Sequence, residues 1–391
     1  MARISMDRLR SFSNNASEYL NELQNALNKP HPSKTAPNFS TAAVSELCGI
    51  ARTQFRYLAG KHHLSIGHKP AGAKSRELTL PETISWIQTI ADKPRRNIEA
   101  GQLGRVLAVC NYKGGVAKTS TAVSMAQALT LRGLKVLLVD CDAQGSASLL
   151  LGFNPETDID HEKTTILPFI HGDSESLAPA VRTTYWHNLD VIPGCSAILT
   201  AEFLLPAKAM TDRDYRFWEV IKNGIDPLRK EYDCIIFDTP PSLGHVTLNV
   251  MFAADGLIMP CTPDKLDFTS SVQFWSVFND LAALFPGAEK KAYDFVTIIP
   301  TKVEPKDGHR LTKTWMQEAY GEFMNAIEIP HSAAANMALT QDRTIYDFSK
   351  PVNSPESHRR YKDPMNHLAD YLLRQLETGW ASSTKPTGVS E

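Results

Sequence analysis

The pattern of hydrophobic and polar positions changes along the chain, and the first segment has a helical period. Between residues 5 and 28 apolar side chains recur at intervals of three and four, which predicts an amphipathic helix. Its apolar positions are Met6, Leu9, Phe12, Ala16, Tyr19, Leu20, Leu23 and Leu27. The stretch Lys29-Pro30-His31-Pro32 ends the pattern, because proline cannot continue a helix. We expect residues 1–32 either to pack on the next domain or to pair with their copy in a dimer, and the prolines favour dimerisation.

Residues 38–92 form a second predicted unit. Ser40 or Thr41 can cap a helix that continues to Cys48, and Gly49 provides a turn before a second helix from position 51. The basic stretch HKPAGAKSRELTL is typical of a hairpin, and a third helix follows it. Two helices joined by a glycine turn and followed by a basic wing predict a winged helix-turn-helix domain. Residues 91–104 have no apolar period and are interpreted as a linker.

From residue 105 onward short apolar runs alternate with helical patterns. The predicted strands are 106–110, 135–140, 189–193, 234–238, 256–261 and 295–300, and the predicted helices lie around 119–132, 212–230, 269–284 and 311–325. Strands that are apolar on both faces belong to a buried parallel sheet. The pattern predicts an α/β fold, a doubly wound and mostly parallel sheet over residues 105–378. Residues 379–391 are expected to be a mobile tail.

Composition narrows the class of protein. Hydrophobic residues make up 42% of the chain and charged residues 21%, which excludes global disorder. The sequence has no apolar run of the roughly 20 residues that a membrane span needs. Six cysteines without a CxxC pair indicate neither a disulfide framework nor a zinc site.

Charge is distributed unevenly between the segments. Residues 1–105 carry 15 basic and 8 acidic side chains, a balance of +7, whereas the rest of the chain has a balance of −9. A basic N-terminal region on an acidic body suggests that this region meets nucleic acid.

A candidate phosphate-binding loop follows the first predicted strand. The loop comprises Lys113, Gly114, Gly115, Val116, Ala117, Lys118, Thr119 and Ser120, and a helix begins at its end. Glycines let backbone N–H groups turn toward phosphate oxygens, and the helix N-terminus adds further donors. Lys118 can reach the β- and γ-phosphates, and the Thr119 hydroxyl can hold Mg²⁺.

Two further strands end in carboxylates. One ends at Asp140 and is followed by Asp142, and another ends at Asp238. Ligands of open α/β sheets bind at the carboxyl ends of the strands, where these acids and the phosphate loop would meet. Together the three strand ends predict a nucleotide site.

The loop departs from the ordinary P-loop because position 112 is tyrosine and a second lysine, Lys113, opens it. Here the chain resembles the ParA family of DNA-partition ATPases, which have a deviant Walker A motif. The matching stretches are KGGVAKTS, LLVDCDAQGSAS and YDCIIFDTPPSLG, with weaker matches after GLIMPCTPD and in SAAANMALTQDRTIYDF. The winged unit resembles that of the larger, operator-binding subgroup.

The resemblance implies a role for each matching residue. Lys113 would reach across an ATP-sandwich dimer to the partner's phosphates, while Asp142 would orient the attacking water. Asp140 would support the site, and Asp238 would hold magnesium through a water. Thr301, in the turn after a late strand, would touch the adenine base. Lys118 and Thr119 would keep the roles described above.

Two positions depart from the family, which commonly has glycine at position 117 and proline at 143. Both are alanine here. If Ala117 adopts helical angles, alanine costs nothing there. A methyl group that crowded the phosphates would instead slow turnover, and we expect weak basal hydrolysis.

DNA contacts are expected from two regions. The second helix of the winged unit offers Arg52, Thr53, Gln54 and Arg56 to the major groove, and the wing offers Lys69, Lys74 and Arg76 to phosphates. A late basic cluster could bind DNA without sequence preference; it comprises Arg343, Lys350, Arg359, Arg360 and Lys362. Either set could instead be an ordinary solvated face.

The resemblance implies a homodimeric, cytoplasmic and nucleoid-associated ATPase that uses ATP/ADP and Mg²⁺. The ATP form would bind DNA non-specifically, a ParB-like centromere-binding partner would stimulate hydrolysis, and the ADP form would repress its own operator. Higher-order assembly on DNA and the cargo, plasmid or chromosome, stay open. The alternatives are a nucleotide-sensing transcription regulator, a membrane-surface ATPase of the MinD type, whose basic amphipathic C-terminal helix we do not find, and an electron-transfer ATPase.

Overall fold

A computed structural model describes residues 4–27, 34–72, 75–212 and 214–382. The chain divides into two compact units, Met1–Thr35 and Ala36–Glu391. The first unit contains helix α1 (Met6–Leu27), where the apolar period predicts it. The proline stretch after this helix lies outside the described residues. The choice between packing and dimerisation stays a prediction.

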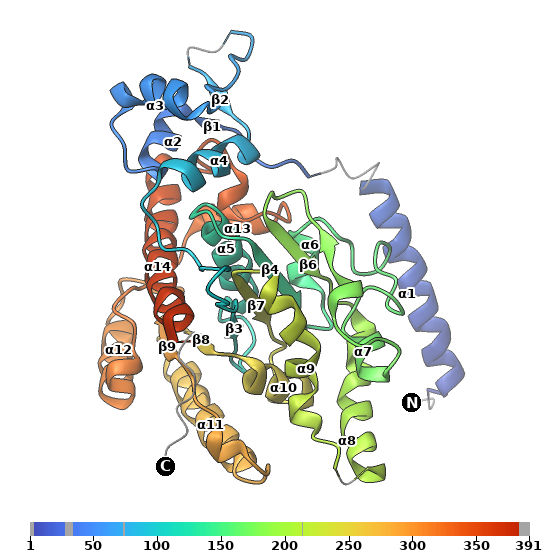
Figure 1. Cartoon of the computed structure of the whole chain (residues 1–391). Coiled ribbons are helices and arrows are strands. Elements are labelled where there is room, and N and C mark those ends of the chain that lie inside the picture. The colour runs from blue at the N-terminus through green and yellow to red at the C-terminus, as the bar shows by residue number, and fades with distance from the viewer. Residues whose placement is uncertain (1–3, 28–33, 73–74, 213, 383–391) are drawn as a thin grey trace, which may run out of the picture. The chain divides into compact units, whose positions relative to one another are not determined.

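The second unit begins with the segment predicted to be a winged domain (Figure 1). Strand β1 (Phe39–Ser40) pairs antiparallel with β2 (Glu77–Leu78), and between them lie α2 (Thr41–Leu47) and α3 (Phe55–His62). A 3-10 turn, η1 (Arg52–Gln54), leads into α3, and α4 (Leu80–Ile90) follows β2. Ser40 is the N-cap of α2, since its hydroxyl accepts a hydrogen bond from the Ala43 N–H at 3.2 Å.

A small apolar core holds these elements together. Val44, Phe55, Leu78 and Trp86 are buried in it, and the rings of Phe55 and Trp86 stack with centroids 4.1 Å apart. Gly49 has φ +67°, a conformation that glycine adopts without strain, and so makes the turn between α2 and η1. Two helices joined by a glycine turn thus precede β2 and α4, and the winged helix-turn-helix assignment stays a prediction.

The predicted linker has no helix or strand, yet one arginine fixes it to the body. The Arg96 guanidinium is buried and donates hydrogen bonds to the carbonyls of Arg229 and Lys230 and to the Asp233 carboxylate. The Gln88 amide of α4 also donates to the Gly133 carbonyl at 2.9 Å. Segments 38–92 and 105–378 thus fall within one compact unit.

A seven-stranded sheet forms the centre of the body, with the order β5-β6-β4-β7-β3-β8-β9. All neighbouring strands are parallel except the pair β5–β6. The strands are β3 (Arg105–Val109), β4 (Val136–Asp140), β5 (Arg182–Thr183), β6 (Leu189–Ile192), β7 (Cys234–Asp238), β8 (Gly256–Cys261) and β9 (Phe295–Pro300). The doubly wound, mostly parallel α/β fold of P-loop NTPases is confirmed.

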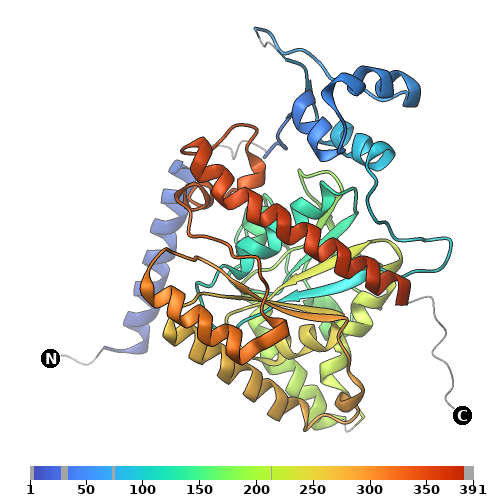
Figure 2. The ribbon, with the colours of Figure 1, turned by 90° about the vertical axis from the view of Figure 1, so that its left-hand side faces the viewer.

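Helices cover both faces of the sheet, so alternate residues of each strand enter different cores. Leu107 and Val109 of β3 pack with α5 (Lys118–Thr130) and α14 (Pro355–Ser382), which crosses this face in Figure 2. Val106 and Ala108 pack on the other side with α9 (Val220–Ile225) and α10 (His245–Ala253). The remaining helices are α6 (Ser146–Leu150), α7 (Leu167–His171), α8 (Ala201–Thr211), α11 (Lys265–Ala282), α12 (Asp307–Tyr320) and α13 (Ala333–Leu339).

Several elements differ from those predicted. The two-residue edge strand β5 is too short for a periodic signal, and α8, α10 and α14 were missed. The helix expected over 212–230 breaks into η4 (Phe217–Glu219), α9 and η5 (Asp226–Lys230), because Pro227 cannot continue α9. Helix α14 continues through Ser382, so the tail boundary at 379 is too early. Residues 383–391 lie outside the described residues.

Two expectations from composition can be compared with the described part of the chain. All six cysteines are buried and free, as expected for core thiols. Across residues 4–382, apart from the gaps given above, no helix combines the length and apolarity of a membrane span.

Candidate functional site

The phosphate loop lies between β3 and α5, as predicted. Gly114 and Gly115 are exposed, and Gly115 has φ +77°. The loop is supported from below, because the buried Thr301 hydroxyl donates a hydrogen bond to the Val116 carbonyl at 2.9 Å. The Thr301 side chain is fully buried and holds the loop, so the contact of Thr301 with the adenine base stays a prediction.

Ala117 occupies a conformation that the sequence did not reveal. It is the residue before α5 and has φ +72° and ψ +30°, in the left-handed region. The Cβ of an L-residue is crowded there, which is why glycine is the usual occupant. The condition under which alanine would cost nothing at position 117 is not met.

Lys118, the first residue of α5, is buried at the floor of the loop. Its ammonium donates to the Lys113 carbonyl at 3.1 Å. Burial lowers the pKa of Lys118, whereas the charges of Asp238 and Asp142 act to raise it. The ammonium thus lies where it can meet both a phosphate and these carboxylates.

Asp238 lies at the end of β7, in the interior of the site. It is fully buried, and within the described residues neither carboxylate oxygen makes a hydrogen bond of normal geometry. Burial, then the neighbouring Asp140, raises the pKa of Asp238 well above its usual range, although the nearby Thr119 hydroxyl and the Lys118 ammonium oppose this shift. A buried carboxylate without a partner is costly, so Asp238 fits a cation bound next to Thr119.

Asp140 has a different role from Asp238. Its Oδ2 accepts hydrogen bonds from the Ser148 N–H at 2.8 Å and the Ser148 hydroxyl at 2.7 Å, and its Oδ1 accepts one from the Asp142 N–H at 3.1 Å. Burial raises its pKa to about 6 in spite of these bonds. Asp142, in contrast, is only half-buried. Its Oδ1 accepts a hydrogen bond from the Gln144 N–H at 3.0 Å.

Lys113 is held by its own chain. Its ammonium lies 3.5 Å from Asp267 Oδ1 on α11, and its side chain is 40% exposed. The preceding Tyr112 hydroxyl donates to the Gln273 side chain of the same helix at 3.1 Å. Helix α11 therefore contacts the start of the phosphate loop through two side chains that the sequence did not indicate.

The predicted recognition residues lie together. Arg52, Thr53, Gln54 and Arg56 are all exposed on η1 and α3. The Gln54 side-chain amide oxygen, Oε1, accepts a hydrogen bond from the Ala51 N–H at 3.1 Å, so this side chain also caps the turn. Tyr57, 68% exposed beside them, was not predicted.

The three basic residues predicted on the wing differ in their surroundings. The Arg76 guanidinium donates to the Gly67 carbonyl at 2.7 Å and so helps to close the hairpin, in which His68 and Glu77 are bridged. Lys69 is exposed. Lys74 lies outside the described residues.

The late basic cluster does not form one exposed surface. Arg343 lies over the Phe348 ring and Lys362 over the Tyr346 ring, at 5.5 and 5.4 Å from the centroids. The remaining members are exposed: Lys350, Arg359 and Arg360.

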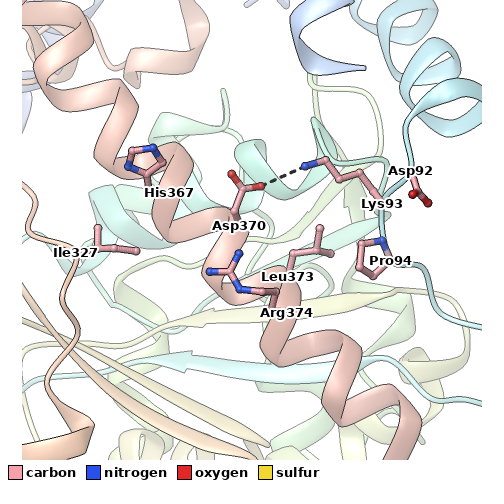
Figure 3. Close-up of a pocket in the computed structure, with 8 residues that line it drawn as sticks. All are labelled: Asp92, Lys93, Pro94, Ile327, His367, Asp370, Leu373 and Arg374. Atoms are coloured by element: carbon pink, nitrogen blue, oxygen red, sulfur yellow. Dashed lines mark ion pairs between the residues drawn. The ribbon is translucent and has the colours of Figure 1, made fainter. Parts of the chain in front are cut away.

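A separate pocket of about 440 Å³ lies between the linker and α14 (Figure 3). Lys93 reaches across it to Asp370 at 3.5 Å, and Asp370 also pairs with Arg132 at 2.8 Å. Two of its charged groups are thus already paired, and the pocket belongs to the junction of the linker with the body.

The fold and the site define a P-loop NTPase with a second lysine at the start of the loop. A family model described as an AAA domain matches residues 104–284. A putative replication protein A of Rhizobium rhizogenes is 28% identical over 370 residues, 91% of this chain and 90% of that protein. SopA of Escherichia coli K12 is 37% identical over 253 residues, 62% of this chain and 63% of SopA. The chromosome partitioning protein ParA of Caulobacter vibrioides is 36% identical over 158 residues, 40% of this chain and 55% of that protein. The chain is therefore similar in sequence to partition proteins of the ParA family.

Two solved structures extend this comparison. A partition protein is 17% identical with a TM-score of 0.65, covers 95% of this chain and 98% of its own, and shares the fold. Cobyrinic acid a,c-diamide synthase from Mycobacterium smegmatis, with a bound ATP analogue and magnesium, is 27% identical with a TM-score of 0.55. The match covers 71% of this chain and 97% of that one.

Proposed function

We propose that the protein is a DNA-partition ATPase whose ATP form is a sandwich dimer bound to DNA without sequence preference. A ParB-like centromere-binding partner stimulates hydrolysis, and with ADP the winged segment binds the protein's own operator. The protein acts in the cytoplasm at the nucleoid. The ParA-family relatives, SopA and the Caulobacter ParA, support this proposal.

The observation that carries the proposal is that one loop has two lysines in different environments, one buried and one partly exposed. Lys118 is buried beside Asp238, which suits it to the phosphates of its own nucleotide. Lys113 lies at the start of the loop, and its ammonium forms a partly exposed ion pair with Asp267. A second cation that can leave its partner is suited to a nucleotide on another subunit, so that the ATP state sets the dimer state.

The residues of the site fit this chemistry. Phosphoryl transfer depends on positioning and on neutralising charge. Lys118 and the backbone N–H groups of the loop hold the phosphates, and Thr119 and Asp238 hold Mg²⁺, which neutralises phosphate charge when bound. Asp142 orients the attacking water. The strained Ala117 in the loop is consistent with a weak basal rate.

Two surfaces are proposed for DNA. Exposed Arg52 and Arg56 contact base edges of the operator, for which arginine is suited by its paired donors. Lys350 and the exposed arginines at the start of α14 contact phosphates of non-specific DNA. These two activities involve different residues, so variants can separate them.

The test measures binding to random duplex and to the promoter of the gene, at fixed salt, with no nucleotide, ADP, ATP or a non-hydrolysable analogue. We expect ATP to drive binding to random DNA and ADP to favour the promoter. Lys113→Ala should abolish the first activity and keep the second, whereas Arg52→Ala should do the opposite. Lys290→Ala, a change at an exposed lysine far from both regions in sequence, is the control. Binding that ignores the nucleotide would reject the proposal.

A second candidate is a nucleotide-sensing transcription regulator that moves no cargo. The exposed arginines of the recognition segment favour it equally. A plasmid-loss assay distinguishes the two, because loss of a partition ATPase destabilises its replicon while loss of a regulator changes only expression.

A further inference from the structure

Hydrogen bonds within the loop that carries Asp142 fix its conformation. It joins β4 to α6, and the Asp142 carbonyl accepts a hydrogen bond from the Gly145 N–H at 2.9 Å. The Asp142 N–H donates to Asp140 Oδ1 at 3.1 Å. The position of the Asp142 carboxylate therefore depends on where Asp140 is held.

Asp140 is in turn held by one serine. The Ser148 hydroxyl, fully buried, donates to Asp140 Oδ2 at 2.7 Å and accepts a hydrogen bond from the Gly194 N–H at 2.8 Å. Because Gly194 follows β6, this hydroxyl connects the ends of two neighbouring strands, β4 and β6. The connection spans 46 residues of sequence.

The backbone of Gly194 packs so closely against Asp140 that a side chain at position 194 would not fit. A Cβ at position 194 would lie 2.7 Å from the Asp140 carbonyl oxygen and 2.9 Å from its Cγ. Gly145 is packed equally closely, since a Cβ there would lie 2.6 Å from the Gly194 carbonyl oxygen. The Ser148 hydroxyl bonds to Asp140 and to the Gly194 N–H in this closely packed region.

We propose that Ser148 is a positioning residue for hydrolysis: its hydroxyl, through Asp140, aims the Asp142 carboxylate at the attacking water. The inference rests on the proposed function, in which Asp142 orients that water. Ser148 is fully buried, its hydroxyl is bonded to Asp140 and Gly194, and it acts through Asp140. Its removal leaves the buried Gly194 N–H without an acceptor and Asp140 with one donor fewer, and the loop relaxes. Since a misplacement of about 1 Å can cost about 100-fold in rate, a smaller relaxation of the loop should lower the rate about tenfold.

The experiment compares Ser148→Ala, Ser148→Thr and Ser146→Ala in the full chain. Ser146 is exposed in the first turn of the same helix and provides a matched control. We expect Ser148→Ala to lower kcat about tenfold, with KM for ATP and the affinity for a fluorescent ADP within about twofold. Ser148→Thr, which keeps the hydroxyl, should restore kcat to within about threefold of wild type. Ser146→Ala should change neither.

A second readout does not depend on turnover. Hydrogen–deuterium exchange of a peptide covering residues 140–150 should be faster in Ser148→Ala than in Ser146→Ala, with other strand peptides unchanged. Unchanged exchange in this peptide overturns the inference, as does full kcat in Ser148→Ala. A loss of ADP binding together with kcat overturns it too, because the serine would then serve the fold. If wild type binds ATP but does not hydrolyse it, the proposed function fails, and the exchange experiment still decides whether Ser148 fixes the loop.

Discussion

Replacing Ala117 with glycine should stabilise the protein, although glycine weakens helix interiors. Ala117 has φ +72°, and the left-handed region costs an L-residue about 1–2 kcal/mol. Glycine removes this cost but gives the unfolded chain more freedom, which takes back about 0.4–1 kcal/mol. The net gain in the free energy of unfolding therefore lies between 0 and about 1.6 kcal/mol, with a central value of about 0.8 kcal/mol.

Urea unfolding of the nucleotide-free protein measures this gain as a higher midpoint at an unchanged slope. The matched control is Ala207→Gly, at an exposed alanine in α8, where the same substitution should cost about 1 kcal/mol. The same alanine-to-glycine change should thus raise the free energy of unfolding at position 117 and lower it at position 207. A loss of stability in Ala117→Gly comparable to that in Ala207→Gly would refute the strain at position 117.

Two further predictions concern charges of the site. Asp267→Asn frees Lys113 from a partly exposed ion pair worth up to about 1 kcal/mol in each subunit. Because a dimer contains two such pairs, the dimer formed with a non-hydrolysable ATP analogue should tighten up to about thirtyfold in sedimentation velocity. A weaker dimer would show that Asp267 acts across the interface. Because burial raises the pKa of Asp238, its contribution to stability is complete below about pH 4 and is lost as the pH rises through the raised pKa. At pH 8 the free energy of unfolding of Asp238→Asn should therefore exceed that of wild type by about 1 kcal/mol, measured by urea unfolding. The same variant should lose Mg²⁺-dependent hydrolysis. A stability difference that does not shrink toward pH 4 would contradict this reasoning.

The elements predicted well are those whose signal is local. The strands ending at Asp140 and Asp238 are buried on both faces and appear as continuous apolar runs, and the structure keeps their ends where predicted. The helix after the phosphate loop begins at Lys118, within one residue of its predicted start. Strand β5 and the break at Pro227 were missed because two-residue pairing and short helical turns leave no period to detect.

Sequence alone determined the fold class and the kind of site, because a phosphate loop and strand-end carboxylates are encoded by neighbouring residues. Only the tertiary structure decided what these residues contact. It placed Thr301 under the loop, paired Lys113 with Asp267, and committed Asp140 to Ser148. Contacts between distant segments depend on how helices and strand ends pack, and no local pattern records them. The left-handed angle of Ala117, at the point where the loop enters α5, is likewise a property that only the structure shows.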